Sequence, residues 1–308
     1  MNVLIVGLGS IARKHIAALQ FLEIDVKVFA LRSDLNANLE KGVTNIFDLD
    51  NSSVKFDFVI ISNPTHLHYK FIEIFALQGV PMFIEKPAIH SLTNASKLLQ
   101  LIEITKAVTY VACNLRFHPC ILFLKNKLKN NDFKINELNV YCGSYLPEWR
   151  PNQNFRTIYS ANHDMGGGVH LDLFHELDYV TWLFGLSKKT IAVLRNVSTL
   201  NIDAVDYANY SLQYPTFTAN IVLNYYRRKP KRQLEIVFEN ETWTVDLIKN
   251  TIINEQEEVL LQATDFQIKD TYTAQLDYFI NCLKNNKEPM NGIQESLEIL
   301  KICLQNGN

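Results

Sequence analysis

The feature that most constrains the fold lies at the start of the chain, where a glycine-rich segment directly follows a short apolar run. Residues 2–6 read Asn-Val-Leu-Ile-Val, which is typical of a buried parallel strand. Residues 7–12 read Gly-Leu-Gly-Ser-Ile-Ala and lead into apolar residues at helical spacing. A G-x-G-x-x-A segment between a strand and a helix is the dinucleotide fingerprint. The sequence therefore predicts an α/β chain that begins with a Rossmann domain.

The small residues of this segment have distinct predicted roles. Gly7 makes the turn, Gly9 lets a pyrophosphate approach the backbone, and Ala12 allows close packing of helix on strand. The helix N-terminus adds free N–H groups and a positive dipole end. The alternative is an ordinary tight turn between strand and helix. We expect the cofactor to contact five residues here: Gly7, Gly9, Ser10, Ile11 and Ala12.

The second predicted strand, residues 26–31, ends in Arg32-Ser33 rather than in an acidic residue. NAD sites usually carry Asp or Glu at this point to hold the ribose hydroxyls. Arginine can instead meet the 2′-phosphate of NADP, with Ser33 as a hydrogen-bond donor. We therefore favour NADP. Two alternatives stay open, because Asp34 would serve NAD if the strand ended later, and Arg32 would be a solvated charge if it met no ligand.

Three more apolar runs, residues 56–62, 80–84 and 108–113, complete the predicted parallel sheet. Ligands of open α/β sheets bind at the carboxyl ends of the strands. Asn63 and Pro64 should therefore border the cofactor, with His68 in the helix that follows. His66 and His68 lack a third ligand nearby, so we expect no metal site.

Glu85-Lys86-Pro87 follows the strand at residues 80–84. A lysine at this position can polarise a substrate oxygen and stabilise negative charge that develops on it. The alternative is a surface lysine in a loop.

A second chemically suggestive segment begins with Gly166-Gly167-Gly168. The apolar run after it extends to Phe184 and stops at Gly185, which predicts one helix. Asp172, His175 and Asp178 are three residues apart, so on one helix they would share a face. Histidine titrates near neutrality and a carboxylate can orient it, which suits proton transfer. The alternative is helix capping and a buried core histidine.

The loop before this segment is rich in aromatic and basic residues. Trp149 can cover a nicotinamide or a sugar ring, and Arg150 and Arg156 can hold an anionic substrate group. Ordinary loop packing is the alternative for each.

The rest of the chain predicts a second domain with a mostly antiparallel sheet. Strand-like runs with short turns occupy residues 190–194, 207–214, 217–226, 232–239 and 242–248. The basic cluster at residues 227–232 is predicted to lie in a turn between strands. Residues 272–285 and 293–305 read as two closing helices.

The composition narrows the class of protein. The chain has 308 residues and a formal charge of −2, and no basic face indicates a nucleic acid partner. No apolar stretch reaches the roughly 18 residues of a membrane span. The first residues lack the basic segment and cleavage site of a secretory signal. The five cysteines include no C-x-x-C pair, which favours reduced thiols in a cytoplasmic protein and no metal site.

Taken together, these segments resemble the Gfo/Idh/MocA oxidoreductases, the family of glucose–fructose oxidoreductase and inositol dehydrogenase. The matching residues are Gly7–Ala12, Asn63-Pro64 with His68, Glu85-Lys86-Pro87, Asn114 to Pro119 with Arg116, and Gly166–Gly168 with Asp172, His175 and Asp178. The resemblance implies a Rossmann domain over residues 1–118 and a substrate-binding and oligomerisation domain over residues 119–308. It implies that Lys86, Asp172 and His175 are catalytic and that Glu85, Lys86 and Arg116 lie beside the cofactor. In the family the histidine usually comes four positions after this aspartate, and here His175 comes three positions after Asp172, which leaves His170 as a fallback partner.

The resemblance implies an NAD(P)-dependent oxidoreductase that acts on a sugar, cyclitol or sugar derivative, with a role in surface-sugar synthesis as one option. It also implies a homodimer or homotetramer. His175 would act as the general base and Lys86 would stabilise the substrate oxygen. Two alternatives remain: an NAD-dependent glycoside-cleaving enzyme on the same scaffold, and a dinucleotide-binding sensor without catalysis.

Overall fold

The computed structural model describes residues 1–22, 25–36, 38–49, 54–130 and 133–305. The chain forms two compact units, one of Met1–Asn114 with Gln267–Glu298 and one of Leu115–Phe266 with Ile299–Asn308. The predicted boundary after residue 118 lies close to the first crossing between the units. The returning segment Gln267–Glu298, which the prediction places in the second domain, belongs to the first unit.

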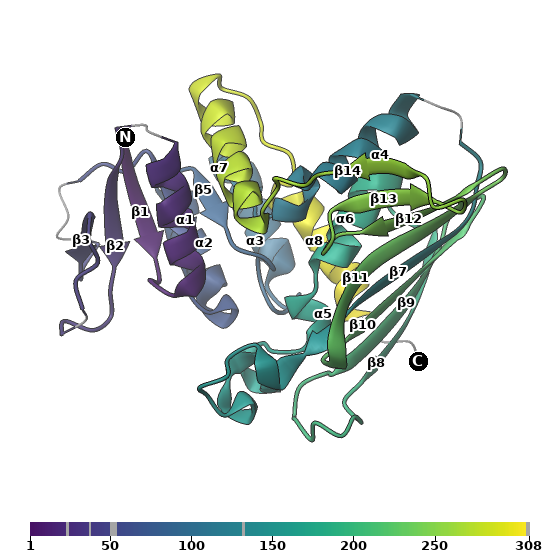
Figure 1. Cartoon of the computed structure of the whole chain (residues 1–308). Helices are drawn as coiled ribbons and strands as arrows, with labels where there is room; N and C mark the ends of the chain where they lie inside the picture. The colour runs from purple at the N-terminus through teal and green to yellow at the C-terminus, as the bar shows by residue number, and fades with distance from the viewer. Residues whose placement is uncertain (23–24, 37, 50–53, 131–132, 306–308) are drawn as a thin grey trace. The chain divides into compact units, whose positions relative to one another are not determined.

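The first unit contains a parallel sheet with the order β3-β2-β1-β4-β5-β6 (Figure 1). Its strands are β1 (Asn2–Val6), β2 (Lys27–Leu31), β3 (Val43–Ile46), β4 (Phe58–Ile61), β5 (Met82–Ile84) and β6 (Thr109–Val111). The strand order reverses between β1 and β4, which is the switch point where such sheets bind ligands. The predicted Rossmann sheet is confirmed. Strand β3 was not predicted, because its sequence Val-Thr-Asn-Ile is short and half polar.

Helices cover both faces of this sheet (Figure 1). They are α1 (Ser10–Phe21), α2 (His68–Leu77), α3 (Ala95–Thr105) and α7 (Ile268–Lys284). Helix α1 packs against α7, and α2 packs against α3. Strands β4 and β5 are buried along their whole length, as expected for a parallel sheet covered on both sides. None of the helices in the described ranges is long and apolar enough to cross a membrane.

The second unit contains an eight-stranded sheet with the order β14-β13-β12-β11-β7-β10-β9-β8 (Figure 1). Its strands are β7 (Ile135–Tyr145), β8 (Lys189–Arg195), β9 (Tyr207–Gln213), β10 (Thr218–Asn224), β11 (Tyr226–Phe238), β12 (Thr242–Asp246), β13 (Thr251–Asn254) and β14 (Val259–Gln262). Strand β10 pairs with β7 in parallel, and the other pairs are antiparallel. Buried and partly exposed residues alternate along β9 and β10, so one face of the sheet is covered. The mostly antiparallel sheet is confirmed.

The helices of this unit correct one prediction. They are α4 (Pro119–Asn130), α5 (Val169–Asp172), α6 (His175–Phe184) and the end of α8 (Ile293–Leu304). The single helix predicted over residues 169–184 is wrong, because the chain leaves helical geometry at Leu173, with φ −96° and ψ 34°. The side chain of Asp172 is held there by tertiary hydrogen bonds, which an apolar pattern does not reveal. Asp172 therefore ends one helix and His175 begins the next.

The basic cluster at residues 227–232 is also corrected, because it lies in β11 and not in a turn. The pairing of β11 with β7 shifts between Tyr226 and Lys231, so the intervening residues form a bulge. Aromatic rings and a buried carboxylate accommodate the charges within the sheet. Arg227 and Lys231 lie over the ring of Tyr141, Arg228 lies over Tyr145, and Arg232 pairs with Glu176.

Candidate active site

The turn between β1 and α1 is shaped to admit a phosphate group. Gly7 has φ +84°, and a Cβ at this position would lie 2.6 Å from the Cα of Asn63, so only glycine fits. A Cβ at Gly9 would meet no atom within 4 Å, which leaves open space beside the backbone. The first turn of α1 carries no acidic side chain and no side-chain cap. Its backbone N–H groups and positive dipole end are therefore available to an anion.

The residues that are predicted to contact the adenosine ribose of the cofactor lie just beyond the end of β2. The backbone N–H of Arg32 donates to Ile46, and its guanidinium donates to the backbone oxygen of Asn38 at 3.4 Å. Within the described ranges Arg32 forms no ion pair with a carboxylate. The carboxylate of Asp34 accepts the backbone N–H of Asn36 at 2.9 Å, which closes a local turn. Both residues remain candidates for the ribose contact.

Asn63 and His68 occupy the edge of the sheet after β4. The side-chain oxygen and nitrogen of Asn63 are buried and have no hydrogen-bond partner among the residues that the structure describes. Buried polar atoms are normally satisfied, so this amide fits a ligand that would complete its bonds. His68 is buried and is surrounded by carbonyl oxygens: Nε2 lies 2.8 Å from Asn63, and Nδ1 lies 3.2 Å from Pro87 and from Ala88. His68, predicted to bind the cofactor, thus connects two loops at this edge.

The loop after β5 carries Glu85, Lys86 and Pro87, and the Lys86–Pro87 peptide bond is cis. The backbone N–H of Glu85 donates to Ile61 at 2.9 Å, which holds the loop beside the end of β4. The Glu85 carboxylate accepts the backbone N–H of Lys86 at 3.3 Å and Nε2 of His15 at 2.6 Å. The first unit therefore gathers the predicted Gly7–Ala12, Asn63-Pro64, His68 and Glu85-Lys86 residues at the carboxyl ends of β1, β4 and β5.

The second unit holds Asp172 between two tyrosines. Tyr159 donates its hydroxyl to Asp172 Oδ1 at 2.7 Å, and Tyr225 donates to Oδ2 at 2.5 Å. Burial, followed by the nearby Asp172 charge, raises the pKa of both phenols, so they stay protonated as donors. A Cβ at Gly167 would overlap the backbone oxygen of Tyr159. The glycine run therefore lets the loop that carries Tyr159 come against α5.

The two histidines of this segment differ in environment. His175 is the first residue of α6 and is partly exposed, which suits proton exchange with a bound substrate. His170, the fallback residue, is buried on α5, and burial lowers its pKa to about 4. A neutral buried imidazole at this position favours a packing role for His170.

Arg116, predicted to lie beside the cofactor, is fully buried in the second unit. Its guanidinium makes two hydrogen bonds with Asp178, at 3.1 Å and 2.8 Å, and lies over the ring of Trp182. This arrangement of two parallel N–H···O bonds ties the segment before α4 to α6. The contact shown by the structure is therefore to the helix that begins with His175.

The predicted substrate residues separate into two groups. Trp149 packs edge-on against Tyr225 with ring centroids 5.3 Å apart, and its indole N–H donates to Ser144. The guanidinium of Arg150 lies 5.9 Å from the ring centroid of Tyr159. Both therefore lie close to the tyrosines that hold Asp172. Arg156 does not belong to this group, because its guanidinium donates a hydrogen bond to the backbone oxygen of Leu200 at 3.0 Å.

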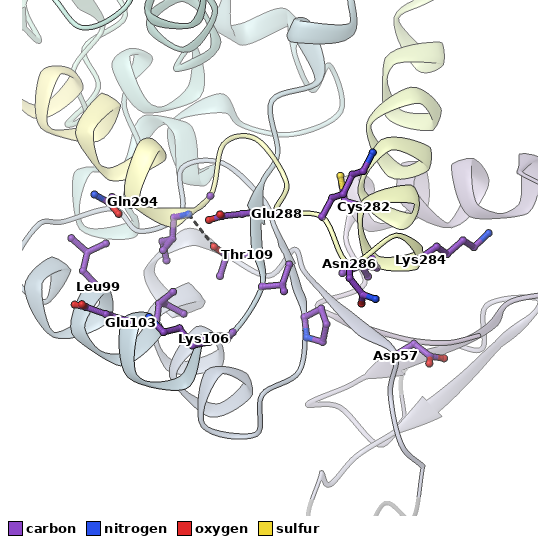
Figure 2. Close-up of a pocket in the computed structure, with 18 of the residues that line it drawn as sticks. Asp57, Leu99, Glu103, Lys106, Thr109, Cys282, Lys284, Asn286, Glu288 and Gln294 are labelled. Carbon is purple, nitrogen blue, oxygen red and sulfur yellow. Dashed lines mark hydrogen bonds between the residues drawn. The ribbon is translucent and has the colours of Figure 1, made fainter.

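A cavity of the first unit lies away from these residues. It has a volume of about 1150 Å³ and lies among α3, the end of α7 and the start of α8, with Glu103, Lys106 and Glu288 on its walls (Figure 2). Asp57 and Pro81, which also line it, precede β4 and β5. This cavity therefore lies at the amino ends of the strands, opposite the edge where such sheets bind ligands. Among the described residues no group of three or more His, Cys, Asp or Glu side chains is arranged to hold a metal ion.

The two halves of the chain match one known family. Residues 1–113 match the NAD-binding Rossmann fold of the Gfo/Idh/MocA oxidoreductase family, and residues 125–304 match its C-terminal alpha/beta domain. The chain belongs to this family. The predicted family and oxidoreductase class are thus confirmed, and the comparisons support this reading over a glycoside-cleaving enzyme or a sensor.

Individual relatives are distant in sequence. An uncharacterized oxidoreductase of Synechocystis sp. is 24% identical over 202 residues, which is 63% of this chain and 54% of that protein, so the match spans about half of its length. UDP-N-acetylglucosamine 3-dehydrogenase of Acidithiobacillus ferrooxidans is 22% identical over 92% of this chain and 88% of its own. Its crystal structure covers 99% of this chain and 96% of its own, at 20% identity and a TM-score of 0.80. The structure of the WlbA dehydrogenase of Bordetella pertussis, in complex with NADH and UDP-GlcNAcA, has a TM-score of 0.81 and 18% sequence identity to this chain. The match covers 97% of this chain and 93% of that chain. These structures share the fold.

Three residues at these sites were not predicted from the sequence. His15 carried a signal, because it is a polar residue on the apolar face of the first predicted helix. Tyr225 carried none, since it ends a strand-like run as many tyrosines do. Tyr159 begins a short 3-10 helix, Tyr159–Ala161, in the connection between β7 and α5, and the sequence there has no periodicity that predicts its contacts.

Proposed function

We propose that this chain is an NAD(P)-dependent oxidoreductase that moves a hydride between the nicotinamide and a hydroxyl-bearing carbon of a sugar, cyclitol or sugar derivative. The observation that carries the proposal is the sheet edge of the first unit. There, an open turn at Gly9 and an Asn63 amide that has no hydrogen-bond partner among the described residues lie beside the loop that bears Lys86. These groups fit a bound dinucleotide.

The residues suggest a division of roles. Gly7–Ala12 would hold the pyrophosphate, Arg32 and Ser33 the adenosine ribose, and Asn63 the nicotinamide end. When bound, the nicotinamide accepts the hydride from the substrate carbon. His175 takes the hydroxyl proton, and the ammonium of Lys86 donates a hydrogen bond to the oxygen as the C=O bond forms. Asp172, held by two tyrosines, would orient substrate hydroxyls next to it.

The proposed substrate class rests on the second unit. A carboxylate, two phenols and the ring of Trp149 lie together, which suits a ring with several hydroxyl groups. Two relatives are by name a UDP-N-acetylglucosamine dehydrogenase and an inositol 2-dehydrogenase, which have substrates of this kind. A role in surface-sugar synthesis is part of this proposal.

The test is a comparison of Lys86→Met and His175→Asn with the wild-type protein on a panel of inositols, sugars and UDP-sugars. We expect each substitution to reduce turnover by about 100-fold or more, because general acid–base groups contribute on this scale. Affinity for the reduced cofactor should stay nearly unchanged. Lys97→Met, on the exposed face of α3, is the control. Near-normal turnover in either test variant contradicts the assignment.

The cofactor preference is a separate proposal. NADP is favoured because Arg32 follows β2 and forms no ion pair within the described ranges. We expect NADPH to bind more tightly than NADH, and Arg32→Ala to weaken NADPH alone by about tenfold, as loss of a charge-assisted bond does. Energy transfer from tryptophan to the nicotinamide measures both. Tighter binding of NADH would assign the ribose contact to Asp34.

We also propose a homodimer or homotetramer located in the cytoplasm, as the resemblance implies. Ile191 and Val193 on β8 are exposed while Ala192 between them is buried, so they lie on the uncovered face of the sheet. Light scattering on the purified protein gives the oligomeric state directly.

A further inference from the structure

His15 is a buried titratable residue to which the proposed reaction assigns no role. It lies on α1, three residues after Ala12, and its side chain is 0% exposed. Nε2 lies 2.6 Å from the Glu85 carboxylate. Nδ1 has no hydrogen-bond partner in the part of the chain that the structure describes. The ring packs edge-on against Phe83 and Tyr272. The polar contact of this imidazole is thus directed at one residue, the neighbour of Lys86.

Glu85 is held as a carboxylate by this arrangement. Burial alone would raise its pKa, but the hydrogen bond from His15 and the charge of Lys86 bring the pKa below its ordinary value. The same carboxylate accepts the backbone N–H of Lys86 at 3.3 Å. The position of the Lys86 backbone therefore depends on Glu85, and the position of Glu85 depends on His15.

The other end of the loop is held by a second histidine. His68 lies within 3.2 Å of the backbone oxygens of Pro87 and Ala88, and within 2.8 Å of that of Asn63. Lys86 thus lies between two buried imidazole contacts, one from α1 and one from α2. Helix α1 begins directly after the turn that is predicted to bind the pyrophosphate. All these residues belong to the first unit.

We propose that His15 is a positioning residue that holds Glu85 and thereby fixes the Lys86 ammonium relative to the pyrophosphate turn at Gly7–Ala12. This inference rests on the proposed function. The link makes the cofactor-binding helix and the lysine loop move as one body. A misplacement of about 1 Å at a reacting group can cost about 100-fold in rate. Loss of the link should therefore lower the rate of the reaction more than the affinity for the cofactor.

The competing explanation is that His15 only fills the core between α1 and β5. Two substitutions separate the explanations. His15→Leu keeps most of the volume and removes the donor. His15→Gln places an amide N–H near the position of Nε2, so it can restore the hydrogen bond to Glu85.

The experiment measures kcat, KM, cofactor Kd and Tm for His15→Leu, His15→Gln, Glu85→Gln and the His15→Leu/Glu85→Gln double variant. We expect His15→Leu to lower kcat by about tenfold or more with cofactor Kd nearly unchanged, and His15→Gln to recover most of the loss. The double variant should be no slower than the slower single variant, because both remove one interaction. Leu19→Ala, a buried change on the same helix, should lower Tm without lowering kcat. A wild-type kcat in His15→Leu, or equal loss in the Gln and Leu variants, overturns the proposal.

A second measurement does not need turnover. Brief acetylation with acetic anhydride, followed by mass spectrometry, reports how reactive the Lys86 amine is in each variant. We expect His15→Leu to change the labelling of Lys86 by about threefold or more, and His15→Gln to restore it, because amine reactivity follows local electrostatics. Lys97 should label equally in all variants. Unchanged labelling of Lys86 overturns the role of His15. Absence of turnover in the wild type on every substrate would instead count against the proposed function.

Discussion

At the scale of single residues, Asp172 shows how the site can keep a carboxylate in place without a rigid helix. The aspartate ends α5, where the backbone already departs from helical geometry. Two phenol hydroxyls fix its oxygens, one from a loop and one from the segment between β10 and β11. Trp149 packs on one of these phenols. The orientation of Asp172 is therefore set by residues far from it in sequence.

Tyr225→Phe tests this arrangement. The change removes one donor to Asp172 while keeping the ring that packs against Trp149. We expect KM for the substrate to rise and turnover to fall, together by about tenfold in kcat/KM, as for loss of a hydrogen bond to a charged group. Steady-state kinetics give both values. Tyr214→Phe, whose hydroxyl bonds the backbone of Gly185, is the matched control. Equal kcat/KM in Tyr225→Phe and wild type would show that this phenol does not set the position of Asp172.

Residues at the carboxyl ends of strands could be predicted because chemistry and position coincide there. The small residues at 7–12 and the lysine at 86 follow apolar runs that are read without knowledge of the tertiary structure. His15 and Tyr225 could not be assigned roles in this way. Their function depends on which side chain lies opposite them, at Glu85 and at Asp172, and neither partner is close in sequence.

At the scale of elements, α6 is anchored by buried charges immediately after His175. Glu176 makes two hydrogen bonds with Arg232 on β11, at 2.6 Å and 3.0 Å. Asp178 makes two with Arg116. Both carboxylates are almost fully buried. Because buried ion pairs require accurate geometry, they fix the start of α6 in position and direction.

Asp178→Asn is the variant that tests this anchor. It leaves the buried Arg116 guanidinium opposite a neutral amide, so we expect a loss of about 3–5 kcal/mol in the free energy of unfolding. Turnover should fall as well, because His175 lies in the same helical turn. Denaturant unfolding and kinetics under folded conditions separate the two effects. Asp164→Asn, at a carboxylate 94% exposed, should change neither. Unfolding free energy equal to that of the wild type would mean that the pair does not anchor α6.

The sequence pattern predicts some of the elements and not others. Strands β1, β4 and β9 and helices α1 and α7 follow apolar runs or helical spacing, so the sequence predicts them. The break at Leu173 was not predicted, because the apolar run continues through it. The basic residues at 227–232 suggested a turn, whereas the structure places them in a bulged strand. There, the rings of neighbouring tyrosines and the carboxylate of Glu176 contact the basic side chains.

At the scale of the whole molecule, the sequence indicated two domains but not that the chain returns to the first. Helix α7 carries an amphipathic pattern, which shows that one face is buried. The pattern does not identify the sheet against which that face packs. In the structure α7 packs against α1, and Asn291 pairs with Val111 through backbone and side chain at the edge of β6. Such long-range pairing leaves no local signal.

Buried histidines in the second unit give the molecule an acid-sensitive stability. Burial lowers the pKa of His118 and of His170 from 6.5 to about 4. At a pH between about 4 and 6.5, each of these histidines is protonated in the unfolded chain and neutral in the folded chain. The unfolded state is therefore favoured as pH falls, by about 1.4 kcal/mol per pH unit for each histidine. Above pH 6.5 both states are neutral and the effect vanishes.

We therefore expect Tm to be level from pH 8 to about 7 and to fall steadily from about pH 6.5 towards 5, as this linkage requires. Glu85 adds a loss of the same sign at lower pH, because its pKa lies below the ordinary value and its stabilisation disappears as the folded carboxylate is protonated. Calorimetry across this range measures the slope. His170→Phe removes one titrating group, so it should reduce the slope by about 1.4 kcal/mol per pH unit even if it lowers Tm at every pH. A variant with the wild-type slope would mean that His170 is protonated in the folded protein. Its imidazole would then carry a positive charge beside Asp172. The role of His170 at this end of α5 would be electrostatic and not only one of packing.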